Sequence, residues 1–116
     1  RDTAQCIAAV LDLDITLVPE LAERNWGELE GKPRELRVRE LTPPGGESLE
    51  TFRARTLAGF TAIMPGRLPL IVAHSGTFRV LCEWLSILQQ AAPVANSQPL
   101  RLRRDSVHCL WISELL

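Results

Sequence analysis

The amino-acid sequence predicts a layered α/β fold around a parallel sheet, and three observations predict it. Segments with helical periodicity alternate with short apolar segments that have the composition of β-strands. Residues 70–73 form a continuous apolar run, as expected for a strand buried on both faces of a parallel sheet. The 116 residues suffice for one small domain, and their 46% hydrophobic and 23% charged content is typical of a globular protein.

The first part of the chain is expected to contain a helix, a strand, a loop and a second, short helix. Apolar residues recur with i, i+3, i+4, i+7 spacing and predict an amphipathic helix over residues 3–11; they are Ala4, Ile7, Ala8 and Leu11. Residues 15–18 are rich in β-branched side chains and are closed by Pro19, which predicts a strand. Residues 20–31 show no period and are expected to form a loop. Residues 33–41 are expected to form a short helix that begins at a proline.

The second part begins with a run of proline and glycine at 43–46, which interrupts regular structure. Ser48 is a suitable N-cap for a long helix that ends at Pro65 and Gly66. A strand over 70–73 follows. Another helix then places apolar side chains on one face, namely Phe78, Leu81, Cys82, Leu85 and Leu88. After a loop over 91–99, residues 100–103 and 107–112 are expected to form two final strands.

Composition argues against several classes of partner. The net charge of −1 gives no reason to expect nucleic acid or an anionic membrane. No apolar run approaches the roughly 18 residues of a membrane span, and no signal-peptide pattern opens the chain. Three cysteines, Cys6, Cys82 and Cys109, lie in apolar context without a CxxC pair, which favours reduced, buried thiols and a cytoplasmic location.

The segment 70–79 carries the strongest pattern that points to chemistry. A buried strand would end at His74, and Ser75-Gly76 would open a helix. Ligands of open α/β sheets bind at the carboxyl ends of strands, and the free N–H groups of a helix N-terminus bind anions. We therefore expect these three residues to hold a phosphate, with Arg79 orienting the site or pairing with a carboxylate. The alternative, a hydrogen-bonded histidine without a ligand, stays open.

An acidic loop with one tryptophan forms the second candidate. Glu23 would follow a strand, and beside Trp26 its carboxyl group could be desolvated enough to act as a general acid. Protonation of a leaving oxygen is what cleavage of a phosphate ester requires of such a group. The alternative is a solvated acidic loop, because glutamate is usually exposed.

The third candidate is the turn that precedes the long helix. Gly45 and Gly46 permit positive φ and close approach of the backbone. Glu47 and Arg55 are expected to form an ion pair that fixes this turn. Nothing in the segment demands contact with a ligand, so a structural role is favoured.

Four motifs in one order resemble the histidine phosphatase superfamily, which includes the phosphoglycerate mutases. They are Glu23-Arg24-Asn25-Trp26-Gly27 with a following Glu30-Gly31, Pro44-Gly45-Gly46-Glu47-Ser48 with Arg55 seven residues after the serine, Val72-Ala73-His74-Ser75-Gly76 with Arg79 five residues after the histidine, and the opening Arg1-Asp2-Thr3-Ala4, which is similar to the end of an Arg-Ala-x-x-Thr-Ala helix. Each motif alone has little specificity. Together they cover essentially the whole chain.

The resemblance implies a three-layer α/β/α sandwich around a mainly parallel sheet. It implies phosphoryl transfer to a histidine and then to water or a second hydroxyl. His74 matches the second active-site histidine, and Glu23 matches the acid that protonates the leaving group. Glu47, Arg55 and Arg79 match positions that support the site. Histidines and arginines meet the phosphoryl charge, so neither a metal nor another cofactor is expected.

Two departures from the family pattern concern the first strand and the first helix. The nucleophile belongs to an Arg-His-Gly motif that this sequence lacks, and of its two histidines His108 has no motif around it and is expected to be structural. The phosphate-binding arginine of the first helix would lie before residue 1. We therefore expect residues 1–116 to be the C-terminal two-thirds of a larger domain, inactive when alone.

The short stretch between Gly31 and Pro43 favours a small phosphatase over a mutase with a large lid. The expected partner is a phosphorylated small molecule. Residues 30–37 followed by residues 42–48 resemble the fructose-2,6-bisphosphatase branch, so a sugar bisphosphate and a phosphoglycerate stay open as substrates. A phosphate-binding module without catalysis is the alternative function, and an oligomer is left open.

Overall fold

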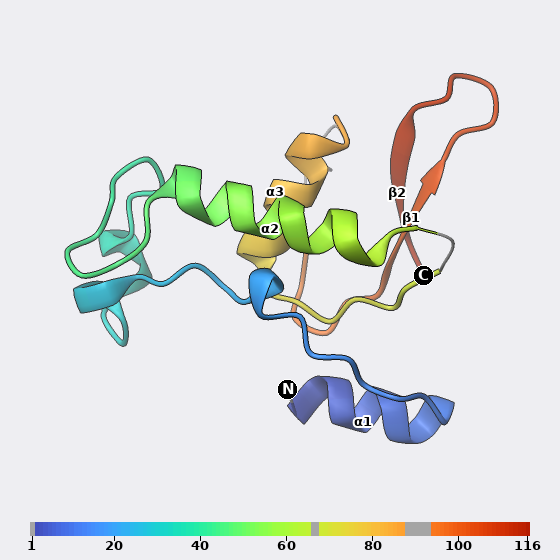
Figure 1. Ribbon diagram of the computed structural model, residues 1–116, viewed down its shortest axis with the longest axis horizontal. Coiled ribbons are helices and arrows are strands. Elements are labelled where there is room, and N and C mark those ends of the chain that lie inside the picture. The colour runs from blue at the N-terminus through green and yellow to red at the C-terminus, as the bar shows by residue number, and fades with distance from the viewer. Residues whose placement is uncertain (1, 66–67, 88–93) are drawn as a thin grey trace.

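The computed structural model describes residues 2–65, 68–87 and 94–116. Within them lie three α-helices, three short 3₁₀ helices and one two-stranded sheet (Figure 1). In chain order these elements are α1 (Asp2–Leu11), η1 (Pro19–Leu21), η2 (Gly27–Leu29), η3 (Arg34–Leu36), α2 (Leu49–Ile63), α3 (Ser75–Trp84), β1 (Leu100–Arg104) and β2 (Trp111–Leu115).

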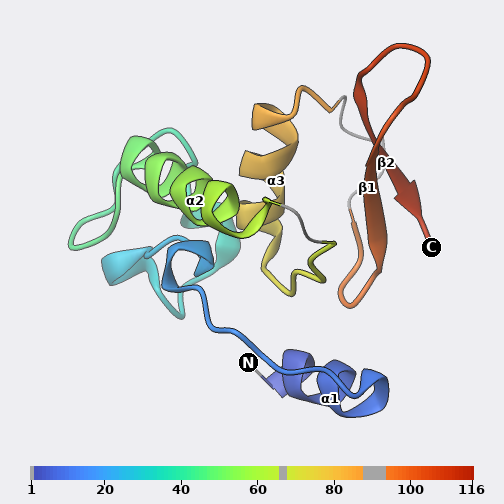
Figure 2. The same cartoon turned by 45° about the vertical axis from the view of Figure 1, so that its right-hand side comes forward.

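Helix α1 agrees with the helix predicted over residues 3–11, but none of its residues is buried. In both views it lies apart from α2 and α3, and the chain reaches η1 through residues 12–18 (Figures 1 and 2). The apolar side chains of Val10 and Leu11 are 83% and 53% exposed. The amphipathic pattern therefore gives a helix here without a packing partner among the described residues.

Helix α2 begins where its cap predicts. The Ser48 Oγ accepts a hydrogen bond of 3.0 Å from the backbone N–H of Thr51, which satisfies one of the free donors of the first turn. Its buried positions are Phe52, Thr56, Gly59 and Phe60, at helical spacing along one face.

The core lies where α2 packs against α3 (Figure 2). Its buried apolar side chains are Phe52, Phe60, Val80, Leu81, Cys82 and Ile87. Helix α2 also packs closely on η1: a Cβ added at Gly59 would lie 2.8 Å from the Cβ of Glu20. The N-terminal loop is thus packed directly on the helix pair.

Strands β1 and β2 form an antiparallel hairpin in which Leu100 is opposite Leu115 and Arg104 is opposite Trp111. Strand β1 matches the strand expected over 100–103, whereas the strand expected over 107–112 begins only at Trp111. The cause is a turn at Asp105: its carbonyl accepts from the N–H of Cys109 at 3.0 Å, and its carboxylate accepts from the N–H of His108 at 3.0 Å.

The strands predicted over 15–18 and 70–73 are absent, which corrects that expectation. Both segments lack regular structure, and among the described residues the only ladder joins β1 to β2. A strand forms only with a hydrogen-bonded neighbour, and without one Leu17 and Leu70 are 67% and 60% exposed. The parallel sheet and the three-layer sandwich therefore stay predictions.

Two further expectations need correction. The helix predicted over 33–41 is reduced to η3, and beyond it the carbonyl oxygens of Arg39 and Leu41 accept from the Arg24 side chain. The thiols of Cys6 and Cys109 are exposed, and only Cys82 is buried; all three are free. Helix α3 ends at Trp84, and the position of Leu88 lies outside the described residues.

Candidate functional site

His74 directly precedes the first turn of α3. It is the N-cap residue, with an extended backbone of φ −83° and ψ 165°, and its side chain makes no capping bond. Its carbonyl accepts from the N–H of Phe78 at 3.1 Å. The imidazole is exposed, as is the side chain of Ser75. The histidine therefore lies beside the free N–H groups of a helix N-terminus, as the sequence predicts, although no strand precedes it.

Glu23 reaches the same helix end from the loop that follows η1. Its Oε2 accepts from the backbone N–H of Gly76 at 3.2 Å, and its Oε1 accepts from the N–H of Arg24 at 2.8 Å. A Cβ at Gly76 would overlap the Glu23 carboxylate, so glycine at this position permits the contact. The structure thus places the Glu23 carboxylate at the helix end that His74 precedes, although the two residues are 51 positions apart in the sequence.

The loop over residues 20–31, which contains Glu23, is called the acid loop below. Thr77 provides a second contact between this loop and α3. Its side chain is fully buried, and its Oγ1 donates to the carbonyl of Leu21 at 3.2 Å. Two adjacent residues of the first turn of α3 therefore bind the loop, Gly76 through Glu23 and Thr77 through Leu21.

Glu47 and Arg55 form the expected ion pair. The Arg55 Nε donates to Glu47 Oε1 at 2.6 Å and its Nη2 donates to Oε2 at 2.8 Å, in a bidentate arrangement. The hydrogen bonds from Arg55 hold the pKa of the Glu47 carboxyl below its ordinary value, against the opposing effect of burial. The pair joins the end of the turn before α2 to the body of that helix.

Arg55 also binds the backbone of the acid loop. Its Nη1 donates to the carbonyls of Glu20 at 2.7 Å and Ala22 at 2.9 Å, and its Nη2 donates to the carbonyl of Glu23 at 3.1 Å. One guanidinium therefore fixes the turn through Glu47 and the acid loop through three main-chain oxygens.

Arg24 is the residue that sequence reasoning overlooked. It is only 3% exposed, and its guanidinium donates to three backbone carbonyls and lies 4.6 Å from the centre of the Trp26 ring. Arg24 belongs to the motif at 23–27, but neither periodicity nor residue type distinguishes a buried arginine in a polar loop from a solvated one. Its burial follows from the path of a loop more than a dozen residues away, which single-sequence patterns do not describe.

Arg79 and His108 lie differently. Arg79 is partly exposed, and its side chain makes no hydrogen bond or ion pair with any residue that the structure describes. His108 is exposed at the hairpin turn, where its Nδ1 lies 2.7 Å from Asp105 Oδ2. The carboxylate expected to pair with Arg79 is therefore not found in the described chain, and His108 has a structural partner.

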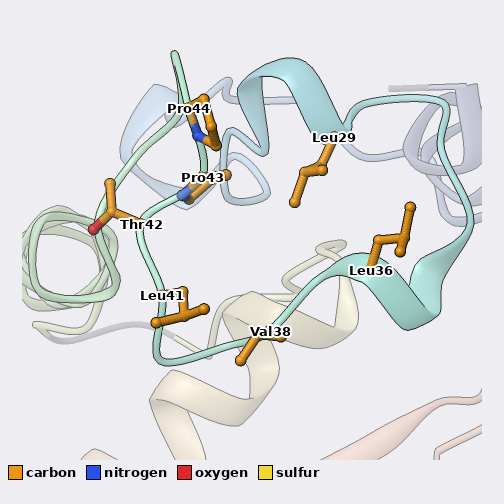
Figure 3. A pocket seen from close by; sticks show the side chains of 7 residues that line it. All are labelled: Leu29, Leu36, Val38, Leu41, Thr42, Pro43 and Pro44. Carbon is orange, nitrogen blue, oxygen red and sulfur yellow. The ribbon is translucent and has the colours of Figure 1, made fainter.

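A small apolar pocket of about 110 Å³ lies beside η2 and η3 (Figure 3). It is lined by Leu29, Leu36, Val38, Leu41, Thr42, Pro43 and Pro44. Figure 3 shows their side chains around the space between η2, η3 and the turn before α2. Its lining holds one hydroxyl and no charged group, so it has nothing to bind a phosphate, and none of the candidate residues lines it.

Two kinds of feature are absent from the parts of the chain that the structure describes. No group of three or more histidine, cysteine, aspartate or glutamate side chains is placed to hold a metal ion. None of the described helices has both the length and the apolar composition of a membrane span.

Comparisons with known proteins agree with the motif series. The model of the histidine phosphatase superfamily (branch 1) matches residues 1–102. The chain is also 31% identical over 92 residues to the uncharacterized phosphatase PhoE of Bacillus subtilis (strain 168). This match covers 74% of the chain and 48% of PhoE, so the chain spans about half the length of the curated relative it matches. No solved structure matches the chain. With a family match over residues 1–102, the chain belongs to the histidine phosphatase superfamily, branch 1.

Proposed function

We infer that residues 1–116 supply the acid and the second histidine of a metal-independent phosphomonoesterase that works through a phosphohistidine. The nucleophilic histidine would be contributed by a segment outside the printed sequence, which has no Arg-His-Gly motif. One observation carries the proposal: Glu23 is held within hydrogen-bonding distance of the first turn of α3, directly after His74. An acid and a phosphate-binding group then meet at one place.

The arrangement suits the negative charge of the phosphoryl group and the negative charge that develops on the leaving oxygen during cleavage. The imidazole of His74 and the N–H groups of Ser75 and Gly76 would donate to oxygens of the phosphoryl group. As the nucleophilic histidine forms its bond to phosphorus, the ester P–O bond breaks, and Glu23 passes a proton to the leaving oxygen. Water then attacks the phosphohistidine and releases phosphate. Arg55, Glu47 and Arg79 would support the site without touching the reacting atoms.

In the observed arrangement both carboxylate oxygens of Glu23 accept hydrogen bonds from backbone N–H groups. A bound phosphoryl group would take over the N–H of Gly76. Release of this bond would leave Oε2 free to carry the proton for the leaving group. The contact is thus the resting position of the proposed acid.

A small phosphorylated metabolite is the proposed substrate, with a sugar bisphosphate or a phosphoglycerate as the alternatives. The name of the B. subtilis relative contains the word phosphatase, which supports hydrolysis over mutase activity. The three free thiols support a cytoplasmic location, because exposed cysteines stay reduced there.

The test is hydrolysis of p-nitrophenyl phosphate in EDTA by the full-length protein. His74→Ala and Glu23→Gln are each expected to lower kcat by about 100-fold or more. The matched control is His108→Ala, which removes the other histidine from an exposed turn and should leave kcat unchanged. Turnover that disappears in EDTA, or that survives in His74→Ala, contradicts the proposal.

One observation favours a second function, a phosphate-binding module without catalysis. The sequence has two histidines, and His108 is paired with Asp105 in the hairpin turn, so the chain offers no second imidazole beside His74. A full-length protein that binds inorganic phosphate in a His74-dependent way but shows no turnover would identify this function instead.

A further inference from the structure

Arg24 is one of three buried polar or charged residues that the structure describes, and the only one of them that carries a charge. Burial lowers the pKa of its guanidinium from the ordinary value, although nearby carboxylates oppose the effect. Arginine remains protonated under such a shift, so a full positive charge is kept away from water. A buried charge is tolerated only where it is fully hydrogen-bonded.

The side-chain hydrogen bonds of Arg24 all go to the loop over residues 39–47. Its Nη1 donates to the Arg39 carbonyl at 2.6 Å, its Nη2 to the Leu41 carbonyl at 2.8 Å, and its Nε to the Glu47 carbonyl at 2.9 Å. Among the described residues it forms no ion pair with a carboxylate. The side chain therefore acts on main-chain atoms of residues 39–47 and holds that loop against the acid loop.

The same residue holds the proposed acid through its backbone. The N–H of Arg24 donates to Glu23 Oε1, so the direction of this N–H sets one of the two anchors of the carboxylate. The side chain of Arg24 is in turn fixed by three carbonyls and by the ring of Trp26. A change in the guanidinium would be passed to Glu23 through one residue of backbone.

We propose that Arg24 is a positioning residue for the acid Glu23. Its side-chain hydrogen bonds hold loop 39–47 against the acid loop and so fix the backbone beside Glu23. The inference rests on the proposed function, in which Glu23 protonates the leaving group. It assigns to a buried arginine a role in rate rather than in binding of the phosphoryl group, since all three of its donor nitrogens are bound to carbonyl oxygens of the chain.

The test compares Arg24→Lys, Arg24→Met and Arg37→Met in the full-length protein with p-nitrophenyl phosphate. Arg37 is the matched control because it also lies over Trp26, at 5.5 Å, and donates to a carbonyl, that of Leu29, without contacting Glu23. Arg24→Met is expected to lower kcat about 10- to 100-fold with KM changed about twofold at most. Arg24→Lys should recover part of the loss and show a shifted alkaline limb of the pH profile of kcat, the limb on which a general acid loses its proton. Arg37→Met should leave kcat and KM unchanged.

A second readout does not depend on turnover. The amide resonance of Gly76 reports its hydrogen bond to Glu23, and Arg24→Lys should shift it as Glu23→Gln does, whereas Arg37→Met should not. An unchanged Gly76 resonance, or a lower melting temperature with normal kcat in Arg24→Lys, overturns the inference. If Glu23→Gln retains full kcat, the proposed function itself fails. If Glu23→Gln loses kcat and the Arg24 variants keep it, only the positioning role fails.

Discussion

Oε2 of Glu23 accepts a hydrogen bond of 3.2 Å from the backbone N–H of Gly76, 53 positions further along the chain. The carboxylate thereby occupies a donor at the N-terminus of α3 that suits an anion. A phosphoryl group at His74 would need the same donor. Under the proposed function, Glu23 and the phosphoryl group would therefore compete for one N–H group.

Glu23→Ala is expected to tighten the binding of inorganic phosphate about 3- to 10-fold, because it frees the N–H of Gly76 and removes a like charge. Isothermal titration calorimetry on the full-length protein measures the change. The control is Glu28→Ala, an exposed carboxylate of the same loop with no side-chain partner among the described residues. Weaker binding in Glu23→Ala would show that the two anions do not compete.

Gly76→Ala is expected to lower the free energy of unfolding by about 1–3 kcal/mol, because the added methyl group overlaps the Glu23 carboxylate. Chemical denaturation measures the loss. The double variant Glu23→Ala/Gly76→Ala should recover most of it, since the obstructing side chain is gone. If the losses in the free energy of unfolding of the two single variants add in the double variant, overlap with the Glu23 carboxylate is not the cause of the loss in Gly76→Ala.

The Glu47–Arg55 pair predicts a stability that depends on pH. The folded pKa of Glu47 lies below its ordinary value of 4.5. Its contribution is therefore fully present above that value and is lost as the pH falls through the lower folded pKa. Glu47→Gln should reduce the free energy of unfolding by about 2 kcal/mol near neutral pH, and the difference from wild type should shrink at acid pH. Glu35→Gln, at an exposed site, should show neither effect. A difference that stays constant with pH would argue against the pair.

Thr56→Val is expected to stabilise the protein by about 1 kcal/mol. The side chain is fully buried in α2, and within the described part of the chain its Oγ1 has no hydrogen-bond partner. Replacing an unsatisfied hydroxyl with a methyl group of similar size removes a desolvation cost. Thr61→Val in the same helix is the control, because its hydroxyl is exposed and donates to the Leu57 carbonyl. Thermal denaturation compares the two.

Local patterns predicted the parts of the structure that depend on near neighbours. The cap at Ser48 and the buried face of α2 follow from helical spacing, and the Glu47–Arg55 pair spans only eight positions. The resemblance of the motifs assigned Glu23 and His74 to one site, but no local rule specifies the contact of the Glu23 carboxylate with Gly76.

The failures share a non-local cause. Residues 15–18 and 70–73 have strand composition, but a strand requires a partner that the described chain does not provide. The burial of Arg24 depends on carbonyls that only the folded loop over 39–47 brings near. The exposure of Cys6 and Cys109 has the same origin, since apolar neighbours in sequence do not guarantee cover in space.

The bonds of Arg24 to main-chain oxygens do not depend on which side chains stand at residues 39 and 41. Every residue type carries a carbonyl, so positions 39 and 41 can change identity without losing these bonds. The apolar pocket draws part of its lining from the same loop, including Leu41 and Thr42. Side chains at the pocket wall can therefore change while the hydrogen bonds of Arg24 to this loop are kept.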